Sequence, residues 1–223
     1  EKQFISQSTV QKRARINSNV TPFVPENVAK MLVEKFPENP YLKDLYYKTD
    51  NDIIDTTQKA SGLYIGSFDP FTNGHLKIVD TISYFLKKLY VYVGVNPDKR
   101  ALFSMDERIK MIEDSIQNIS KNNNCEIIVG KHDGLGVDLA KKLNVPIMVR
   151  GVRNSMDFSN EVSLAGANNN LAPNISTAFL TLPNYTYISS SLVRFKIERK
   201  LDVSDIVPNG TMNVINEHYS KQN

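Results

Sequence analysis

Short apolar runs alternate with longer segments of helical character from Leu63 onward, and this alternation limits the possible folds more than any other feature of the sequence. Five runs rich in β-branched and aromatic residues are predicted to be strands, at 63–65, 89–95, 126–129, 147–149 and 177–182. Several are apolar enough to be buried on both faces. Strands that alternate with helices form parallel sheets with right-handed crossovers. We therefore predict an α/β fold: a doubly wound, parallel, five-stranded sheet with helices on both faces.

Helical spacing is clearest after the first two predicted strands. From Leu76 to Phe85 an apolar residue recurs at every third position, which places these side chains on one side of a helix. Ser104 and Glu107 form a capping-box pattern ahead of a further apolar series. Because such a pair satisfies two free N–H groups at a helix start, it predicts that a helix begins there.

The first predicted strand runs into a turn crowded with glycine, proline and asparagine, and a histidine follows. The stretch is 62–75, Gly-Leu-Tyr-Ile-Gly-Ser-Phe-Asp-Pro-Phe-Thr-Asn-Gly-His. A helix start offers free N–H donors and the positive end of the helix dipole. The turn therefore predicts a phosphate site that includes His75. Asp69 and Pro70 are expected to fix the turn, and a metal-binding role for Asp69 is the alternative.

Two further cationic segments follow predicted strands and should reach the same edge of the sheet, where ligands gather in folds of this class. Lys99 ends a loop after the second strand, and Arg150 and Arg153 follow the fourth. An arginine side chain is a planar fork that suits phosphate oxygens. An ion pair between Arg153 and Asp157 at helical spacing is a structural reading that does not exclude a site.

A run of serines follows the fifth predicted strand. It reads Tyr-Ile-Ser-Ser-Ser at 187–191, with Arg194 one helical turn further on. Serine is favoured at helix starts, where free N–H groups and hydroxyls can bind phosphate. The other histidines, His132 and His218, lack such a setting and are interpreted as structural or solvated.

Composition favours small anions as partners over nucleic acid or membranes. The formal net charge is +3 without a long basic run, and no apolar stretch approaches the roughly 18 residues that a membrane span needs. The single cysteine, Cys125, excludes an intramolecular disulfide and lies in an apolar run that predicts core packing. We expect a cytoplasmic protein. Because the chain begins at Glu1 without methionine, we expect a fragment or processed product.

The N-terminal segment repeats the C-terminal one. Residues 4–36 align with 187–219 without a gap at a constant offset of 183 (188 − 5), and eight of the 33 paired positions are identical. This predicts that 1–36 is the tail of a preceding, related domain, that 37–61 is a linker and that 62–223 is the domain that carries the motifs above. An unrelated helical extension is the alternative.

Taken together, these motifs resemble those of bacterial-type phosphopantetheine adenylyltransferases, over about 62–220. The resemblance rests on the 66–75 turn with its Thr-Asn-Gly-His ending, on Asn-Pro-Asp-Lys at 96–99, on Arg150-Gly-Val-Arg153 with Glu161, and on the serine run. It implies a Rossmann-like domain that transfers AMP from ATP to 4′-phosphopantetheine with Mg²⁺, giving dephospho-coenzyme A and pyrophosphate. It also implies a homo-oligomer, a hexamer in the bacterial enzymes.

The resemblance implies specific roles. The catalytic residues would be His75, Lys99 and Arg150. The contacts to 4′-phosphopantetheine would come from Ser67, Lys99, Leu135, Gly136 and Arg150. Those to ATP would come from Ser67, Phe68, His75, Gly151, Val152, Arg153, Glu161, Tyr185, Thr186, Tyr187, Ile188, Ser189, Ser190 and Ser191. No protein residue is assigned to a metal.

The sequence departs from the family pattern at 168–171 and 174–176. In the family these residues belong to a helix and to the surface between subunits, so the departures concern the hexamer. Two other functions stay open. Another small-phosphate adenylyltransferase, such as nicotinate-nucleotide adenylyltransferase, shares the histidine and serine motifs. A non-catalytic nucleotide-binding half of a tandem protein would bind ATP without turnover.

Overall fold

The computed structural model describes residue 32 and residues 60–95, 100–117, 119 and 124–220. The chain divides into two compact units, Glu1–Thr57 and Gln58–Asn223, and the second is described below. Nearly all of the predicted tail and linker, 1–36 and 37–61, lies outside the described residues, and so does Lys99. The predictions made for those parts therefore stay predictions.

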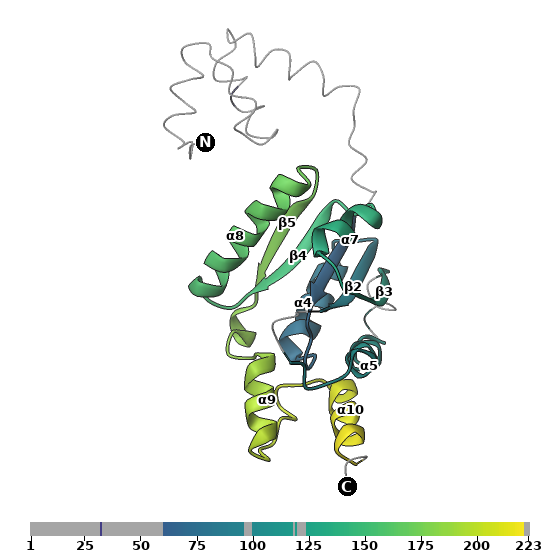
Figure 1. The fold of residues 1–223 in the computed structure, drawn as a ribbon, viewed down its shortest axis with the longest axis vertical. Helices are drawn as coiled ribbons and strands as arrows, with labels where there is room; N and C mark the ends of the chain where they lie inside the picture. Colours follow the sequence, from purple (N-terminus) through teal and green to yellow (C-terminus); the bar gives the residue numbers. More distant parts are fainter. Residues whose placement is uncertain (1–31, 33–59, 96–99, 118, 120–123, 221–223) are drawn as a thin grey trace. The chain divides into compact units, whose positions relative to one another are not determined.

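The second unit is built on a parallel sheet, and the predicted α/β architecture is confirmed. Its strands lie in the order β3-β2-β1-β4-β5 (Figure 1), with bounds β1 Ser61–Gly66, β2 Lys88–Gly94, β3 Glu126–His132, β4 Ile147–Val152 and β5 Ser176–Thr181. β1 pairs in parallel with both β2 and β4. The chain thus leaves β1 toward one side and later returns on the other, which opens a crevice at the carboxyl ends of β1 and β4.

The connections between strands are mainly helical, as expected for parallel pairing. Two helices, α9 and α10, extend beyond one end of the sheet (Figure 1). The α-helices are α4 Asn73–Ser83, α5 Met105–Ile116, α7 Gly136–Lys142, α8 Ser155–Leu171, α9 Ser190–Glu198 and α10 Asn209–Ser220, and a short 3₁₀ turn, η2, covers Pro183–Tyr185. None of the helices within the described ranges is long and apolar enough to cross a membrane.

Apolar side chains cover both faces of the sheet because side chains alternate along a strand. In β1, Tyr64 belongs to the larger core cluster, whereas Leu63 and Ile65 belong to the smaller one. The larger cluster draws on α4, α5, α9 and α10, and the smaller on α7. Cys125 is 1% exposed in the larger cluster, as its apolar run predicted.

Element types agree with the sequence pattern, and one boundary matters for function. The predicted capping box is present: the Ser104 N–H donates to the Glu107 carboxylate, and the Glu107 N–H donates to the Ser104 hydroxyl. The strand predicted at 147–149 continues to Val152, so Arg150 and Gly151 lie inside β4, paired with β5, and not in a segment after it. The Arg150 side chain therefore has a rigid strand as its base.

Candidate functional site

A cavity of about 430 Å³ lies at the crevice between the ends of β1 and β4. It gathers most of the predicted site residues, although they come from the first turn, β4, α8 and the serine run. Those that line it are Ser67, Phe68, His75, Arg150, Gly151, Val152, Arg153, Glu161, Tyr185, Ile188, Ser189, Ser190 and Ser191. Distant segments of the chain therefore meet around one space.

Four predicted contact residues lie elsewhere. The Thr186 hydroxyl donates to the Pro183 carbonyl at 3.1 Å, and Tyr187 is 64% exposed; neither lines the cavity. Leu135 and Gly136, at the start of α7, are also absent from its lining. The family resemblance implied these four contacts, and a resemblance in sequence does not show which way each side chain faces.

His75 lies in the first turn of α4, and its ring nitrogens have distinct environments. The Thr72 N–H donates to Nδ1 at 3.1 Å, so Nδ1 is an acceptor and the proton of the neutral ring is on Nε2. The ring packs among aromatic side chains, 5.1 Å from Phe68 and 5.6 Å from Phe71 between centroids. Burial, followed by the charge of Arg153, lowers the His75 pKa from 6.5 to about 3. The imidazole is therefore neutral at physiological pH, with an N–H to donate.

The turn before His75 is held in an unusual conformation. Phe68 has φ 46°, in the left-handed region that side chains other than glycine seldom adopt. A Cβ on Gly66 would lie 3.1 Å from the Phe68 ring, so glycine suits this close approach. Both oxygens of Asp69 accept backbone N–H groups at 2.9 Å, from Leu102 and Phe103.

Asp69 thus acts as a structural anchor. It ties the turn to the chain just ahead of α5, as the sequence predicted. Within the described ranges, no group of three or more histidine, cysteine, aspartate or glutamate residues is arranged to hold a metal ion.

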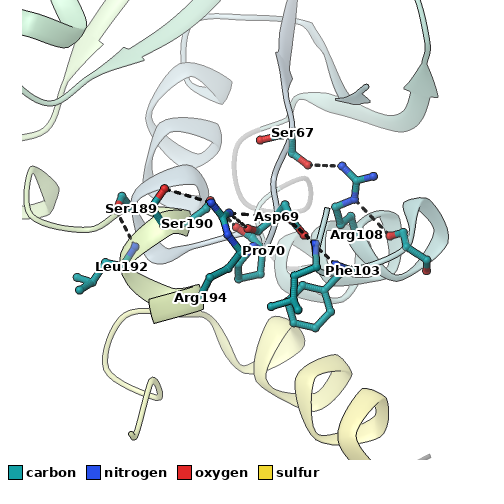
Figure 2. A network of polar contacts seen from close by, with 12 residues as sticks. Ser67, Asp69, Pro70, Phe103, Arg108, Ser189, Ser190, Leu192 and Arg194 are labelled. Atoms are coloured by element: carbon teal, nitrogen blue, oxygen red, sulfur yellow. Dashed lines mark hydrogen bonds and ion pairs between the residues drawn. The ribbon is translucent and has the colours of Figure 1, made fainter. Parts of the chain in front are cut away.

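Side chains from two helices bind carbonyl oxygens of the same turn (Figure 2). Arg108 of α5 donates from Nη1 to the Ser67 carbonyl at 2.8 Å. Arg194 of α9 donates to the Asp69 carbonyl, and the Ser190 hydroxyl donates to the Pro70 carbonyl at 2.8 Å. Protein donors therefore occupy three carbonyl oxygens of the turn, those of Ser67, Asp69 and Pro70.

Sequence reasoning missed Arg108, although a signal was present. Arg108 precedes Met111 and Ile112 by three and four residues, so it shares the face of α5 that those buried side chains occupy. It is only 7% exposed. A charged residue on the apolar face of an amphipathic helix needs a buried partner. Here that partner is the Ser67 carbonyl.

At the start of α9, the serine hydroxyls serve the protein itself. The Ser189 hydroxyl caps the helix by accepting the Leu192 N–H at 3.0 Å, and the Ser191 hydroxyl accepts from Arg194 at 3.2 Å. The Ser190 O–H is used on the Pro70 carbonyl, whereas the Ser189 and Ser191 hydroxyls are acceptors here and keep their own O–H donors for an anion. Backbone N–H groups add to these donors. The first N–H groups of a helix, here those of Ser190 and Ser191, have no partner within it.

Arg150 is held by a paired carboxylate. Its Nε and Nη2 donate to the two oxygens of Glu161 on α8, at 2.6 and 2.7 Å, and its Nη1 donates to the Ile65 carbonyl at 2.9 Å. Burial acts to lower the pKa of Arg150, but the hydrogen bonds and charge of Glu161 outweigh it and raise that pKa. The alternative reading of Arg153 is also confirmed, since its Nε lies 2.7 Å from Asp157.

Positive charge dominates the described lining of the cavity. Five arginines, at positions 100, 108, 150, 153 and 194, face two carboxylates, Asp69 and Glu161. A cleft lined mainly by one sign of charge concentrates ligands of the opposite sign. With the neutral imidazole and the helix start, this arrangement suits a polyphosphate.

Comparisons with known proteins agree with this geometry. The cytidylyltransferase-like family model matches residues 63–196. A phosphopantetheine adenylyltransferase from Methylocella silvestris is 40% identical, with 66% of this chain and 88% of that protein covered. The phosphopantetheine adenylyltransferase from Streptococcus agalactiae is 41% identical, with 68% of this chain and 91% of that protein covered. The one from Mesorhizobium japonicum is 35% identical, with 73% of this chain and 99% of that protein covered.

Solved structures with the same fold are more distant in sequence. A nicotinic acid mononucleotide adenylyltransferase from Plasmodium falciparum has a TM-score of 0.55 at 19% identity, covering 72% of this chain and 96% of that one. A putative nicotinate-nucleotide adenylyltransferase from Vibrio parahaemolyticus has a TM-score of 0.53 at 13% identity, covering 71% and 93%. At these identities the likeness establishes the Rossmann-like nucleotidylyltransferase fold and nothing finer.

Proposed function

The chain belongs to the phosphopantetheine adenylyltransferase family, and on that premise we propose that it transfers the adenylyl group of ATP to 4′-phosphopantetheine, giving dephospho-coenzyme A and pyrophosphate. The observation that carries this proposal is the meeting of His75, Arg150 and the start of α9 around one cavity. These are the groups that a reaction between two phosphate-bearing substrates needs, because several negative charges are brought together.

The chemistry needs no covalent intermediate and no general base. An oxygen of the 4′-phosphate attacks the α-phosphorus of ATP, a new P–O bond forms, and the bond to the β-phosphate oxygen breaks as pyrophosphate leaves. Since the attacking phosphate is already ionised, the protein contributes position and charge stabilisation. His75 donates its Nε2–H to the α-phosphate as charge builds there, while the start of α9 holds the leaving phosphates.

Magnesium enters this scheme with the nucleotide. We propose MgATP as the substrate, with the ion bound by phosphate oxygens. Supporting this, both Asp69 oxygens accept backbone N–H groups and both Glu161 oxygens accept from Arg150. Both carboxylates in the described lining are thus already engaged by protein donors.

The role of Arg150 sets one condition on the proposal. Glu161 and the Ile65 carbonyl engage three of the five N–H donors of Arg150, so a 4′-phosphate would bind the other two or exchange with Glu161. Its anchored position on β4 keeps the guanidinium at the cavity in either case.

The direct test is to incubate the purified chain with ATP and 4′-phosphopantetheine and to identify dephospho-coenzyme A by mass spectrometry. Pyrophosphate that appears only when both substrates are present supports the proposal. ATP binding without pyrophosphate, in protein shown to be folded, would favour the non-catalytic alternative.

A homo-oligomer is proposed as well. Met156, Leu164 and Leu171 lie on one side of α8 and are 76%, 46% and 54% exposed, while Phe158 and Val162 are exposed on another side of this helix. An exposed apolar stripe on a helix is typical of a surface that another chain covers. Because the family relation implies self-association, a second copy of this chain is the proposed occupant.

A further inference from the structure

We propose that Arg108 is a positioning residue for adenylyl transfer: by holding the Ser67 carbonyl, it turns the N–H of the next residue, Phe68, toward the triphosphate. The inference concerns the same cavity as the proposed function and rests on a phosphate being bound there. It gives a specific role to a buried residue of α5 that so far counts only as one of the five arginines of the cavity lining.

The argument begins with the peptide group that joins Ser67 to Phe68. In a trans peptide the C=O and the N–H point in opposite directions. Arg108 Nη1 donates to this C=O at 2.8 Å (Figure 2), so the N–H of the same unit points away from Arg108. Within the described ranges, the Phe68 N–H donates to no backbone acceptor. Both residues line the cavity, so this donor is placed for a ligand.

The conformation of Phe68 explains why the peptide must be held. With φ at 46°, Phe68 occupies a region that is unfavourable for a bulky residue. Relaxation to an ordinary φ would rotate the neighbouring peptide groups and move the N–H. Two contacts oppose that relaxation: the bond from Arg108 to the carbonyl, and the packing of the Phe68 ring against Tyr64 at 5.1 Å between centroids.

Arg108 itself is fixed more firmly than a surface arginine. Its Nε also donates to the Ser104 carbonyl at 3.3 Å, and only 7% of the residue is exposed. One guanidinium thus joins the helix start of α5 to the phosphate turn. The positive charge of Arg108 also offsets the partial negative charge of the Ser67 carbonyl oxygen beside the cavity. Without Arg108, that oxygen would repel a phosphate.

The experiment observes this peptide group directly. Ser67-Phe68 is the only Ser-Phe pair in the chain, so protein labelled with ¹³C-carbonyl serine and ¹⁵N-phenylalanine gives one HNCO peak, which reports both sides of that peptide. In the wild-type chain, MgATP should move the Phe68 amide proton downfield. An unmoved peak under saturating MgATP would overturn the proposal without any variant being made.

Variants then assign the effect to Arg108. Arg108→Met keeps the stem and removes the donors; it should shift the Ser67 carbonyl peak in the free protein and abolish the response of the amide to MgATP. Its kcat should fall about 10²-fold, with the KM for ATP changed far less, because a misplaced donor costs most in the transition state. Arg108→Lys should recover part of both signals.

Lys110→Met is the matched control, since Lys110 lies on the same helix and pairs with Glu217 at 2.7 Å. It should change neither the peak nor kcat. A folded Arg108→Met chain with normal kcat, or one with a higher KM and an unchanged kcat, would contradict the positioning role. Because the NMR response needs only MgATP, it separates this inference from the proposed acceptor: absence of turnover with 4′-phosphopantetheine would leave the peak test intact.

Discussion

The backbone N–H of Thr72 donates to Nδ1 of His75 at 3.1 Å, so the residue that caps α4 also selects the tautomer of the imidazole beside the cavity. The side-chain hydroxyl of Thr72 accepts the backbone N–H of His75 at 3.4 Å. Histidine thus takes the place that glutamate or glutamine holds in an ordinary capping box. A local helix-start motif therefore leaves Nε2–H as the donor for phosphate.

Loss of this donor should slow the chemistry much more than it weakens binding. His75→Ala is expected to lower kcat about 10³-fold, the range for removing a principal transition-state donor. The dissociation constant for ATP, measured by calorimetry, should change far less. His132→Ala is the matched control, because His132 lies outside the cavity lining and should leave kcat unchanged. A His75→Ala enzyme with near wild-type turnover would contradict the role given to the imidazole.

The lowered His75 pKa predicts a specific acid sensitivity. Its pKa is about 3 in the fold against an ordinary 6.5, so the unfolded chain binds more protons between these values. The contribution of His75 to stability is therefore complete above pH 6.5 and decreases as pH falls toward 3. Between pH 6.5 and pH 4, the melting temperature of His75→Gln should therefore fall less than that of wild type.

NMR checks the same assignment without unfolding. The ring signals of His75, identified by their absence in His75→Gln, should stay constant from pH 8 to pH 5 in the ligand-free protein. A titration centred near pH 6.5 would show that the ring is more solvated and more basic than the structure indicates.

Replacing Arg150 should affect one substrate more than the other. Arg150→Lys keeps the charge but cannot bind both oxygens of Glu161 and the Ile65 carbonyl together. We expect the KM for 4′-phosphopantetheine to rise about tenfold and that for ATP to change less, in steady-state kinetics with each substrate varied. Arg199→Lys, a change at an exposed arginine that lies 3.7 Å over the Phe195 ring, is the control. Equal effects on both substrates would argue against a selective contact.

The apolar stripe on α8 predicts how the chain assembles. Leu164→Glu places a charge in that stripe and should lower the molar mass measured by size exclusion with light scattering. Ser159→Glu adds the same charge to α8 outside the stripe and should leave the mass unchanged. If both variants keep the wild-type mass, or if the wild-type chain is monomeric, the α8 surface does not join copies of this chain.

The sheet could be predicted from sequence because its central strands are apolar on both faces, as Leu63, Tyr64 and Ile65 illustrate. The end of β4 could not, since Arg150 and Gly151 break the apolar run. The charge of Arg150 is satisfied by Glu161, eleven residues later on another element. A partner that only tertiary structure supplies is not visible in a local pattern.

The site was predictable as a set of segments but not as a set of contacts. The serine run does lie at a helix start by the cavity, yet its hydroxyls bind Leu192, Pro70 and Arg194. Motif spacing identifies a helix start and cannot say which atoms remain free. Arg108 is the opposite case. It was not predicted, although the sequence already places it on the buried face of α5.

The described C-terminal copy shows which positions of the repeat are buried. Each buried apolar residue of the C-terminal copy aligns with an apolar residue of the N-terminal copy. The pairs join Ile188, Val193, Val203, Ile206, Val207, Val214 and Ile215 with Ile5, Val10, Val20, Phe23, Val24, Met31 and Leu32, in that order. Conservation of core positions is what a shared fold would require. The relation between the two segments stays a prediction.

The central claim is that this cavity transfers an adenylyl group to the phosphate of 4′-phosphopantetheine. The most direct measurement is pyrophosphate release from MgATP with 4′-phosphopantetheine or nicotinate mononucleotide as acceptor, compared as kcat/KM in the wild-type and His75→Ala chains. The account predicts that the wild-type chain prefers 4′-phosphopantetheine by about 10²-fold or more. It also predicts that kcat/KM with 4′-phosphopantetheine falls about 10³-fold in His75→Ala. A preference for nicotinate mononucleotide, or no pyrophosphate with either acceptor in folded protein that binds ATP, would contradict it.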